Sequence, residues 1–237
     1  MTKSRCWIVA AALCVAMAIL GGGSAVAASL SSADLTIQPF QLPKQGGVPV
    51  TATLAGTVDQ ADGRPEEGKA VTLRLDRQLT VHGAGQPTCG PGKLKNKNPA
   101  EARQKCKAAL VGSGKIIMRI QYPERAPFDV PGSVLLFNGA AGHLITYTFV
   151  GPPLGPAAIM TRGVAAGRTV EISLPRGPGG VLVSFRLRIG RTWTQSGKRH
   201  GYLSGRCPSG TLHNKVTLAL PSGASTLPVQ QRCKAGS

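Results

Sequence analysis

The residues that could perform chemistry are few, because the chain of 237 residues carries only ten carboxylates and four histidines. Asp76 and Glu171 lie in strand-like segments, and hydrolysis of a glycosidic bond uses two such carboxyl groups, one as acid and one as base or nucleophile. The competing interpretation is a pair of solvated strand residues that contact nearby arginines. A cell-wall or glycan hydrolase is therefore the alternative function, and not the first one.

A nucleophilic site is the second candidate for chemistry. His82 follows Asp76 closely in the sequence and could complete a hydrolytic constellation with a distant serine such as Ser204. Lone histidines in loops are more often solvated surface residues. The chain has no Gly-x-Ser-x-Gly or His-Glu-x-x-His motif, and no phosphate-binding Gly-x-x-x-x-Gly-Lys that is followed by Ser or Thr. We assign no catalytic residue, and we expect neither a metal nor a cofactor.

Positive charge is the strongest remaining signal, because the formal net charge is +18 and no carboxylate follows Glu171. We expect a polyanion-binding face with Trp193 and Tyr202 available to stack on the ligand, formed by Arg186, Arg188, Lys198, Arg199 and His200. The alternative is a solvated basic surface. A second basic cluster comprises Lys93, Lys95, Lys97, Arg103, Lys105 and Lys107. The expected partner is an anionic cell-envelope polymer or an acidic glycan. Specific nucleic-acid binding is not expected, because aromatic residues make up only 4% and no recognition motif occurs.

The N-terminus predicts export. Lys3 and Arg5 precede an apolar run, and small residues at Ala25 and Ala27 suit cleavage, so residues 1–27 are interpreted as a signal peptide. A retained membrane anchor is the alternative, but the apolar run is shorter than the ~20 residues that span a bilayer. We expect a secreted or envelope-associated domain over 28–237, without a transmembrane segment in the mature chain.

Four cysteines remain after such cleavage, namely Cys89, Cys106, Cys207 and Cys233. An even number in an exported chain indicates disulfides. Three pairings are open, and the spacing favours the sequential one, because each close pair brackets a short segment. A zinc site is the alternative, but no Cys-x-x-Cys spacing occurs.

The elements that must position these residues are mostly strands. Apolar residues alternate with polar ones over many short runs, most clearly from Val181 to Ile189, and turn-forming residues separate the runs. The pattern predicts a mainly β fold: an antiparallel β-sandwich, as one large or two packed sandwiches. A subdivision near 123–133 is the alternative to a single domain.

One short α-helix is expected near 99–110. Asn98 is a good N-cap, Pro99 suits the first helical position, and Glu101 can reach back to the cap. Gly112 and Gly114 are expected to end the helix.

One pattern extends over most of the mature chain and comprises the runs 71–80, 87–89, 98–106, 109–114, 137–139 and 197–204, together with Cys207. This pattern resembles a family of uncharacterised secreted actinobacterial proteins. It implies secretion and four structural cysteines in a β-rich chain, and it implies no activity or binding residue.

Overall fold

A computed structural model describes residues 28–60, 66–122, 124–175 and 180–236 of the chain, so the expected signal peptide lies outside the described residues. The strands are β1 (Ser29–Gln38), β2 (Gln41–Pro43), β3 (Val48–Asp59), β4 (Ala70–Arg74), β5 (Leu79–Val81), β6 (Leu110–Tyr122), β7 (Arg125–Asn138), β8 (His143–Val150), β9 (Ala157–Ala166), β10 (Thr169–Ser173), β11 (Gly180–Ile189), β12 (Thr192–Gln195), β13 (Lys198–Gly201), β14 (Leu203–Gly205), β15 (Thr211–Leu220), β16 (Gly223–Arg232) and β17 (Lys234–Gly236). The helices are α1 (Pro99–Lys105) and the 3₁₀ turns η1 (Pro91–Lys93), η2 (Lys107–Ala109) and η3 (Ala140–Gly142).

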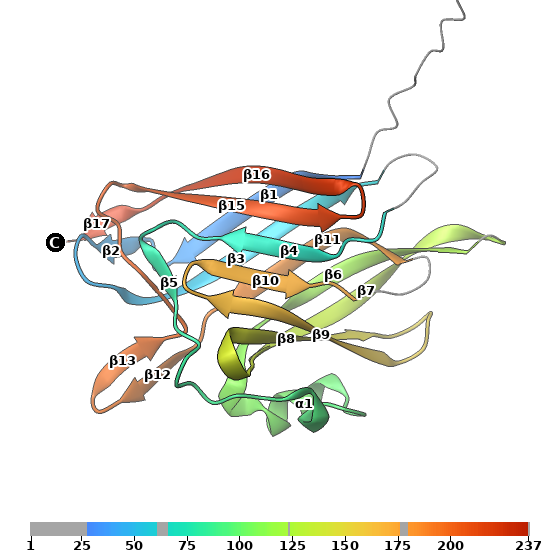
Figure 1. The fold of residues 1–237 in the computed structure, drawn as a ribbon, viewed down its shortest axis with the longest axis horizontal. Coiled ribbons are helices and arrows are strands. Elements are labelled where there is room, and N and C mark those ends of the chain that lie inside the picture. Colours follow the sequence, from blue (N-terminus) through green and yellow to red (C-terminus); the bar gives the residue numbers. More distant parts are fainter. Residues whose placement is uncertain (1–27, 61–65, 123, 176–179, 237) are drawn as a thin grey trace, which may run out of the picture.

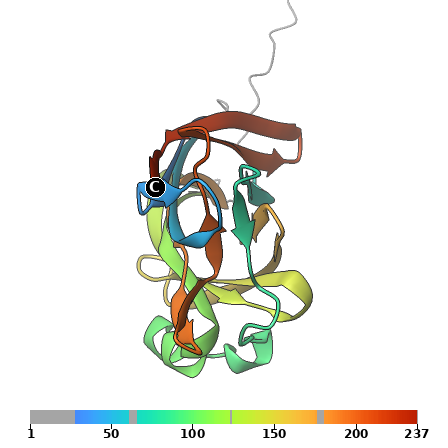
Figure 2. The ribbon, with the colours of Figure 1, turned by 90° about the vertical axis from the view of Figure 1, so that its left-hand side faces the viewer.

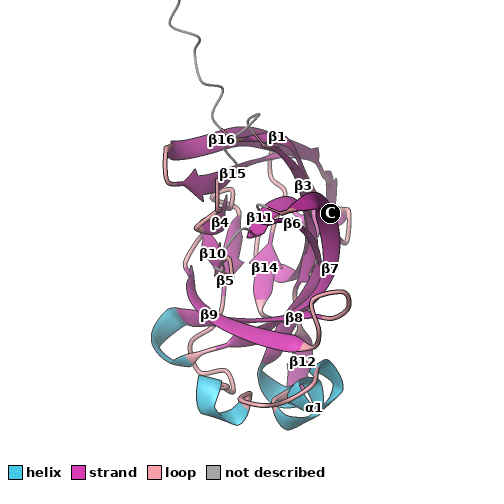
Figure 3. Ribbon diagram, turned by 90° about the vertical axis from the view of Figure 1, so that its right-hand side faces the viewer, coloured by secondary structure: helices cyan, strands magenta, loops and turns pink. Residues whose placement is uncertain are grey.

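Most strands form one antiparallel sheet in the order β16-β15-β4-β10-β9-β8-β7-β6-β11-β3-β14-β5, with β1 also paired to β3. The sheet turns back on itself, so that β15, β4, β10 and β9 face β3, β11, β6 and β7 (Figure 1, Figure 3). The expected mainly β sandwich with one short α-helix is confirmed. β7 occupies most of the segment 123–133 and pairs with both β6 and β8.

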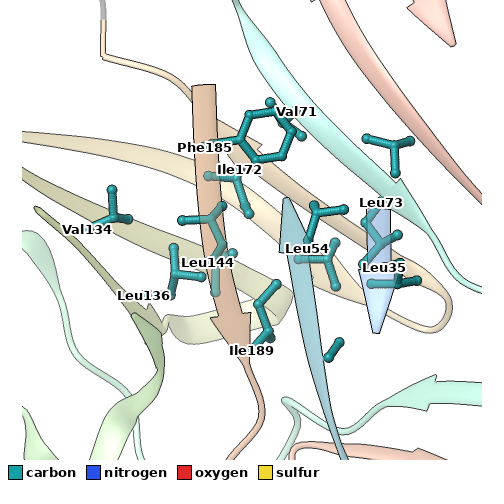
Figure 4. Packing of buried hydrophobic residues seen from close by; sticks show 14 of the residues in the cluster. Leu35, Leu54, Val71, Leu73, Val134, Leu136, Leu144, Ile172, Phe185 and Ile189 are labelled. Atoms are coloured by element: carbon teal, nitrogen blue, oxygen red, sulfur yellow. The ribbon is translucent and has the colours of Figure 1, made fainter. Parts of the chain in front are cut away.

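The main core lies between these two layers. In β11, Phe185, Leu187 and Ile189 are buried, whereas Arg186 and Arg188 are exposed, as the alternation predicted. The three buried side chains belong to the same core cluster as Val71 and Ile172 of the opposite layer (Figure 4). The arginines consequently point away from the core.

The sheet is nearly closed by a seam between β1 and β16, which lie side by side (Figure 1). Side chains make the bridging hydrogen bonds: Leu30 N donates to Ser225 Oγ at 3.0 Å, and Gln231 Nε2 donates to Ile37 O at 3.1 Å. Gln231 Oε1 also accepts from Ile37 N. One glutamine side chain thus pairs both backbone groups of Ile37.

A second, smaller core lies on the outer face of β7 and β8, under the excursion from Cys89 to Ala109. Leu135, Phe137 and Tyr147 pack there against the buried Leu94 and Ala102. These two strands are therefore buried on both faces, and every residue of Val134–Asn138 and Leu144–Thr148 is buried, the threonines at 146 and 148 included.

The helix begins as expected but ends early. Asn98 Oδ1 accepts from the backbone N–H groups of Ala100 and Glu101, and Glu101 Oε2 accepts from Asn98 N. α1 ends at Lys105, and Gly112 and Gly114 lie within β6, so their expected role as a helix stop was wrong. A Cβ at Gly114 would lie 2.2 Å from Arg186 O, so these glycines allow the close approach of β11.

The sequential disulfide pairing is confirmed. Cys89 bonds to Cys106 and Cys207 to Cys233, with Cα–Cα distances of 5.8 and 6.2 Å. Across the described ranges, no helix has the length and apolar character needed to cross a membrane.

Candidate functional site

The hairpin β12–β13 forms a separate two-stranded sheet at the same end of the sandwich as the helical excursion (Figure 2). Gln195 pairs with Lys198, which leaves Ser196 and Gly197 as a two-residue turn with φ values of 51° and 73°. Two consecutive positive φ angles are typical of the type I′ turn, whose twist matches that of the flanking strands. The local sequence thus fixes the register of the hairpin.

That register places Trp193 directly opposite His200. Their rings stack, with centroids 5.7 Å apart and planes inclined by 17°. Trp193 is half-buried and packs against the margin of the main core, while His200 is exposed. The pair is therefore an anchored aromatic surface at the edge of the fold.

A glycine lets the hairpin approach β3. A Cβ at Gly201 would lie 2.6 Å from Leu203 O and 2.7 Å from Pro49 Cβ, so any larger residue would push the hairpin away. The position of the aromatic pair relative to the main sheet depends on this contact.

His82 and Ser204 lie beside the hairpin. His82 follows β5 and Ser204 belongs to β14, and these two strands pair although they are far apart in sequence. His82 N donates to Tyr202 O at 2.8 Å, and His82 Nε2 and Ser204 Oγ are hydrogen-bonded at 2.7 Å. The structure therefore brings together the histidine and serine that the sequence analysis named.

These residues line a groove of about 370 Å³, which we call the hairpin groove. Its lining residues are Gly47, Pro49, His82, Gln86, Trp193, Arg199, His200, Gly201 and Ser204. None of these described residues is a carboxylate. The groove combines an aromatic surface, a guanidinium group and several neutral hydrogen-bonding groups, which is the chemistry for holding a polar, anionic ring compound.

A buried asparagine holds the loop that carries Gln86. Asn138 Nδ2 donates to Gly83 O at 3.0 Å and to Pro87 O at 3.2 Å, while Cys89 N donates to Asn138 O at 2.9 Å. Asn138 is 1% exposed. Sequence reasoning missed both Gln86 and Asn138, because a polar residue at the end of an apolar run does not reveal which distant loop it will hold.

No family model, no curated protein and no solved structure matches this chain. The resemblance to secreted actinobacterial proteins stays a prediction, and the site has to be interpreted from its own geometry.

The five residues of the expected polyanion-binding face lie on two different sheets. Arg186 and Arg188 are exposed on β11 of the main sheet, whereas Lys198, Arg199 and His200 are exposed on β13. Arg186 lies directly opposite Lys115 on β6, and like charges so placed repel each other. Their action as one face stays a prediction.

Tyr202 is not available to stack on a ligand, so that expectation was wrong. It is 0% exposed, and burial raises the pKa of its phenol well above the ordinary value. Tyr202 lies just beyond the end of the hairpin, between β13 and β14, and its side chain packs in the main core although His200, two residues earlier, is exposed.

Asp76 has a structural role. Its Oδ1 accepts from Gln78 N at 2.8 Å and its Oδ2 from His213 N at 2.7 Å, so the carboxylate closes the turn after β4 and ties it to β15. Glu171 lies within β10, opposite Thr72 of β4, whereas Asp76 lies beyond the end of β4, two residues after Arg74. Both oxygens of Asp76 are already hydrogen-bonded to backbone N–H groups, which disfavours a glycosidase pair.

The same bonds keep Asp76 from orienting His82. Among the described residues, the side chain that is hydrogen-bonded to the His82 ring is that of Ser204. The two residues therefore form a pair and not a catalytic triad. No cluster of three potential metal-ligating side chains occurs among the described residues.

The one ion pair in the described part of the chain joins Arg119 to Asp129 at 2.7 Å, and this hydrogen bond lowers the pKa of Asp129.

Proposed function

We propose that the protein is a secreted, non-enzymatic module of the cell envelope or extracellular space that binds an anionic polymer, with an acidic glycan as the first candidate. One observation carries the proposal: the hairpin groove joins the stacked Trp193–His200 pair to Arg199, and none of the described residues that line it is a carboxylate. The two disulfides support an oxidising location.

The groove suits one acidic sugar residue of such a polymer. An indole ring presents a large apolar face that can stack on the C–H face of a sugar. A guanidinium group binds carboxylate or phosphate through two parallel hydrogen bonds. The excess of positive charge on the rest of the chain attracts the remainder of the polymer at longer range.

Calorimetric titration of the purified protein with polygalacturonate tests the proposal. We expect Trp193→Ala and Arg199→Gln each to weaken binding about tenfold, and affinity to fall steeply between ~0.05 and ~0.15 M salt. Arg162→Gln is the matched control, because it removes the same charge from an exposed position of β9 that lies outside the groove lining and outside the expected polyanion-binding face. We expect it to weaken binding no more than about twofold.

Equal losses of affinity for Arg199→Gln and Arg162→Gln would mean that only the net charge of the protein matters. Unchanged affinity in Trp193→Ala would remove the groove from the proposal.

The His82–Ser204 hydrogen bond is the observation that favours the alternative, a glycan or cell-wall hydrolase. Incubation with the same polymer and with purified cell-wall material distinguishes the two functions. A binding module releases no new reducing ends or soluble fragments. Release that disappears in Ser204→Ala or Glu171→Gln would replace binding by hydrolysis.

A further inference from the structure

A second hollow, separate from the hairpin groove, lies between the helical excursion and the hairpin β8–β9. It measures about 440 Å³, within the range of small-molecule sites. One wall is the segment 95–98, which carries Lys95 and Lys97, and the floor is apolar: Phe149, Pro156, Ala158 and Met160. We call it the lysine hollow.

The wall is held in place before any ligand binds. Leu94 is buried in the second core, and Lys97 N donates to Leu94 O at 3.3 Å. The Tyr147 hydroxyl donates a short hydrogen bond to Lys97 O, and Asn98 is fixed as the cap of α1. The Cys89–Cys106 disulfide closes the excursion. Such preorganisation lowers the entropic cost of binding.

The floor keeps apolar surface in contact with solvent. Phe149 and Met160 are half-buried and pack against the second core, while Pro156 and Ala158 are exposed. The floor therefore joins the second core to the surface. An alkyl or aryl group laid on it would bury the remaining apolar area of both side chains.

The wall of the hollow is positively charged, whereas its floor is uncharged. The wall carries two ammonium groups, and none of the described lining residues is a carboxylate. Glu101 lies outside this lining: it accepts a hydrogen bond from Asn98 N and contributes, after burial, to the raised pKa of Tyr147. The same excursion carries further cations at Lys93, Arg103, Lys105 and Lys107.

We propose that the lysine hollow binds a single-chain anionic amphiphile, with its apolar chain on the floor and its carboxylate or phosphate at Lys95 and Lys97. An amphiphile matches both the apolar floor and the cationic wall. A small anion would leave the floor uncovered, and a neutral alkyl chain would leave the two ammonium groups without a counter-charge. The inference does not rest on the glycan-binding function, since it uses other residues.

The experiment is a titration of the purified protein with a chain-length series of carboxylates, from butyrate to decanoate, below the concentration at which they form micelles. We expect binding to strengthen with each added methylene, by up to about fourfold. Decyltrimethylammonium, which has the same chain and the opposite charge, should not bind.

Two pairs of variants locate the site. Ala158→Glu places a carboxylate in the hollow and should weaken decanoate binding at least tenfold, whereas Ala157→Glu, at the neighbouring exposed position outside the lining, should change it less than twofold. The second comparison is between two double variants that remove the same charge. Lys95→Gln combined with Lys97→Gln should weaken decanoate binding more than Lys93→Gln combined with Lys105→Gln.

Three results would overturn the proposal. Affinity independent of chain length would mean an anion contact without the floor. Equal losses in the matched lysine variants would mean attraction by net charge. Binding only to micelles or to vesicles that contain an anionic lipid would mean a membrane contact and no site for a single amphiphile.

Discussion

The hairpin groove and the lysine hollow are both basic, but the fold builds them in different ways. The groove depends on the main sheet: a two-residue turn, the register of Trp193 with His200, and the close approach of Gly201 to β3 position its residues. The hollow depends on a local unit, in which a disulfide, a helix cap and a second core hold the lysine wall. We therefore expect the hairpin groove to keep its geometry for as long as the sandwich is folded. The lysine hollow can lose its geometry while the sandwich stays folded.

The largest expected effect comes from Cys89→Ala combined with Cys106→Ala. The excursion then loses its covalent closure, and we expect the free energy of unfolding to fall by about 3 kcal/mol in denaturant titrations. Decanoate binding should be lost, because the lysine wall is no longer fixed. Polygalacturonate binding should persist, since Asn138 still holds the loop that carries Gln86 through its hydrogen bonds to Gly83 and Pro87. A parallel loss of both activities would contradict the separation of the two regions.

Tyr147→Phe should have an intermediate effect. It removes the donor to Lys97 O and leaves that carbonyl unpaired, which should cost about 1 kcal/mol of unfolding free energy at pH 7. We expect weaker decanoate binding and an unchanged hairpin groove. A loss of polygalacturonate affinity would show that the two regions are coupled.

The same variant tests the effect of pH. Burial, and secondarily Glu101, raises the pKa of Tyr147 above its ordinary value of 10.0. The unfolded chain therefore releases this proton first, so the contribution of Tyr147 to stability is complete below about pH 10 and is lost as the pH rises further. Denaturant titrations at neutral and alkaline pH should show a smaller alkaline loss in Tyr147→Phe than in the unchanged protein.

Ser196→Asn should have the smallest effect and should act on the groove alone. Ser196 has a positive φ angle, a conformation that asparagine adopts more readily. We expect the hairpin to gain a few tenths of a kcal/mol and polygalacturonate to bind slightly better, as measured by calorimetry. Decanoate binding is the internal control. A change there would show that the hairpin and the lysine wall do not act independently.

Local pattern predicted the strands that have one buried and one solvated face, such as β3 and β11. It missed strands such as β1, β9 and β16, whose apolar residues are fewer or less regular. Gly112 and Gly114 were interpreted as a helix stop, because the reason for a small residue there is the backbone of β11, which lies far away in sequence.

The site was predictable only in part, for the same reason. His82, Ser204, Arg199 and His200 were named from the sequence, but their meeting depends on the pairing of β5 with β14 and on the hairpin register. No local period encodes that pairing. Tyr202 was misjudged because its type suggested stacking, whereas its position between β13 and β14 buries its side chain in the main core.

The seam between β1 and β16 has a consequence for how the chain folds. Its hydrogen bonds join residues 194 and 195 positions apart, so they can form only after a very long loop has closed. Folds dominated by such distant pairings fold in milliseconds to seconds, more slowly than those with local contacts. Before β16 packs beside it, β1 has a free edge with which another chain could pair. Gln231 then pairs with the backbone of Ile37 on that edge and so opposes self-association.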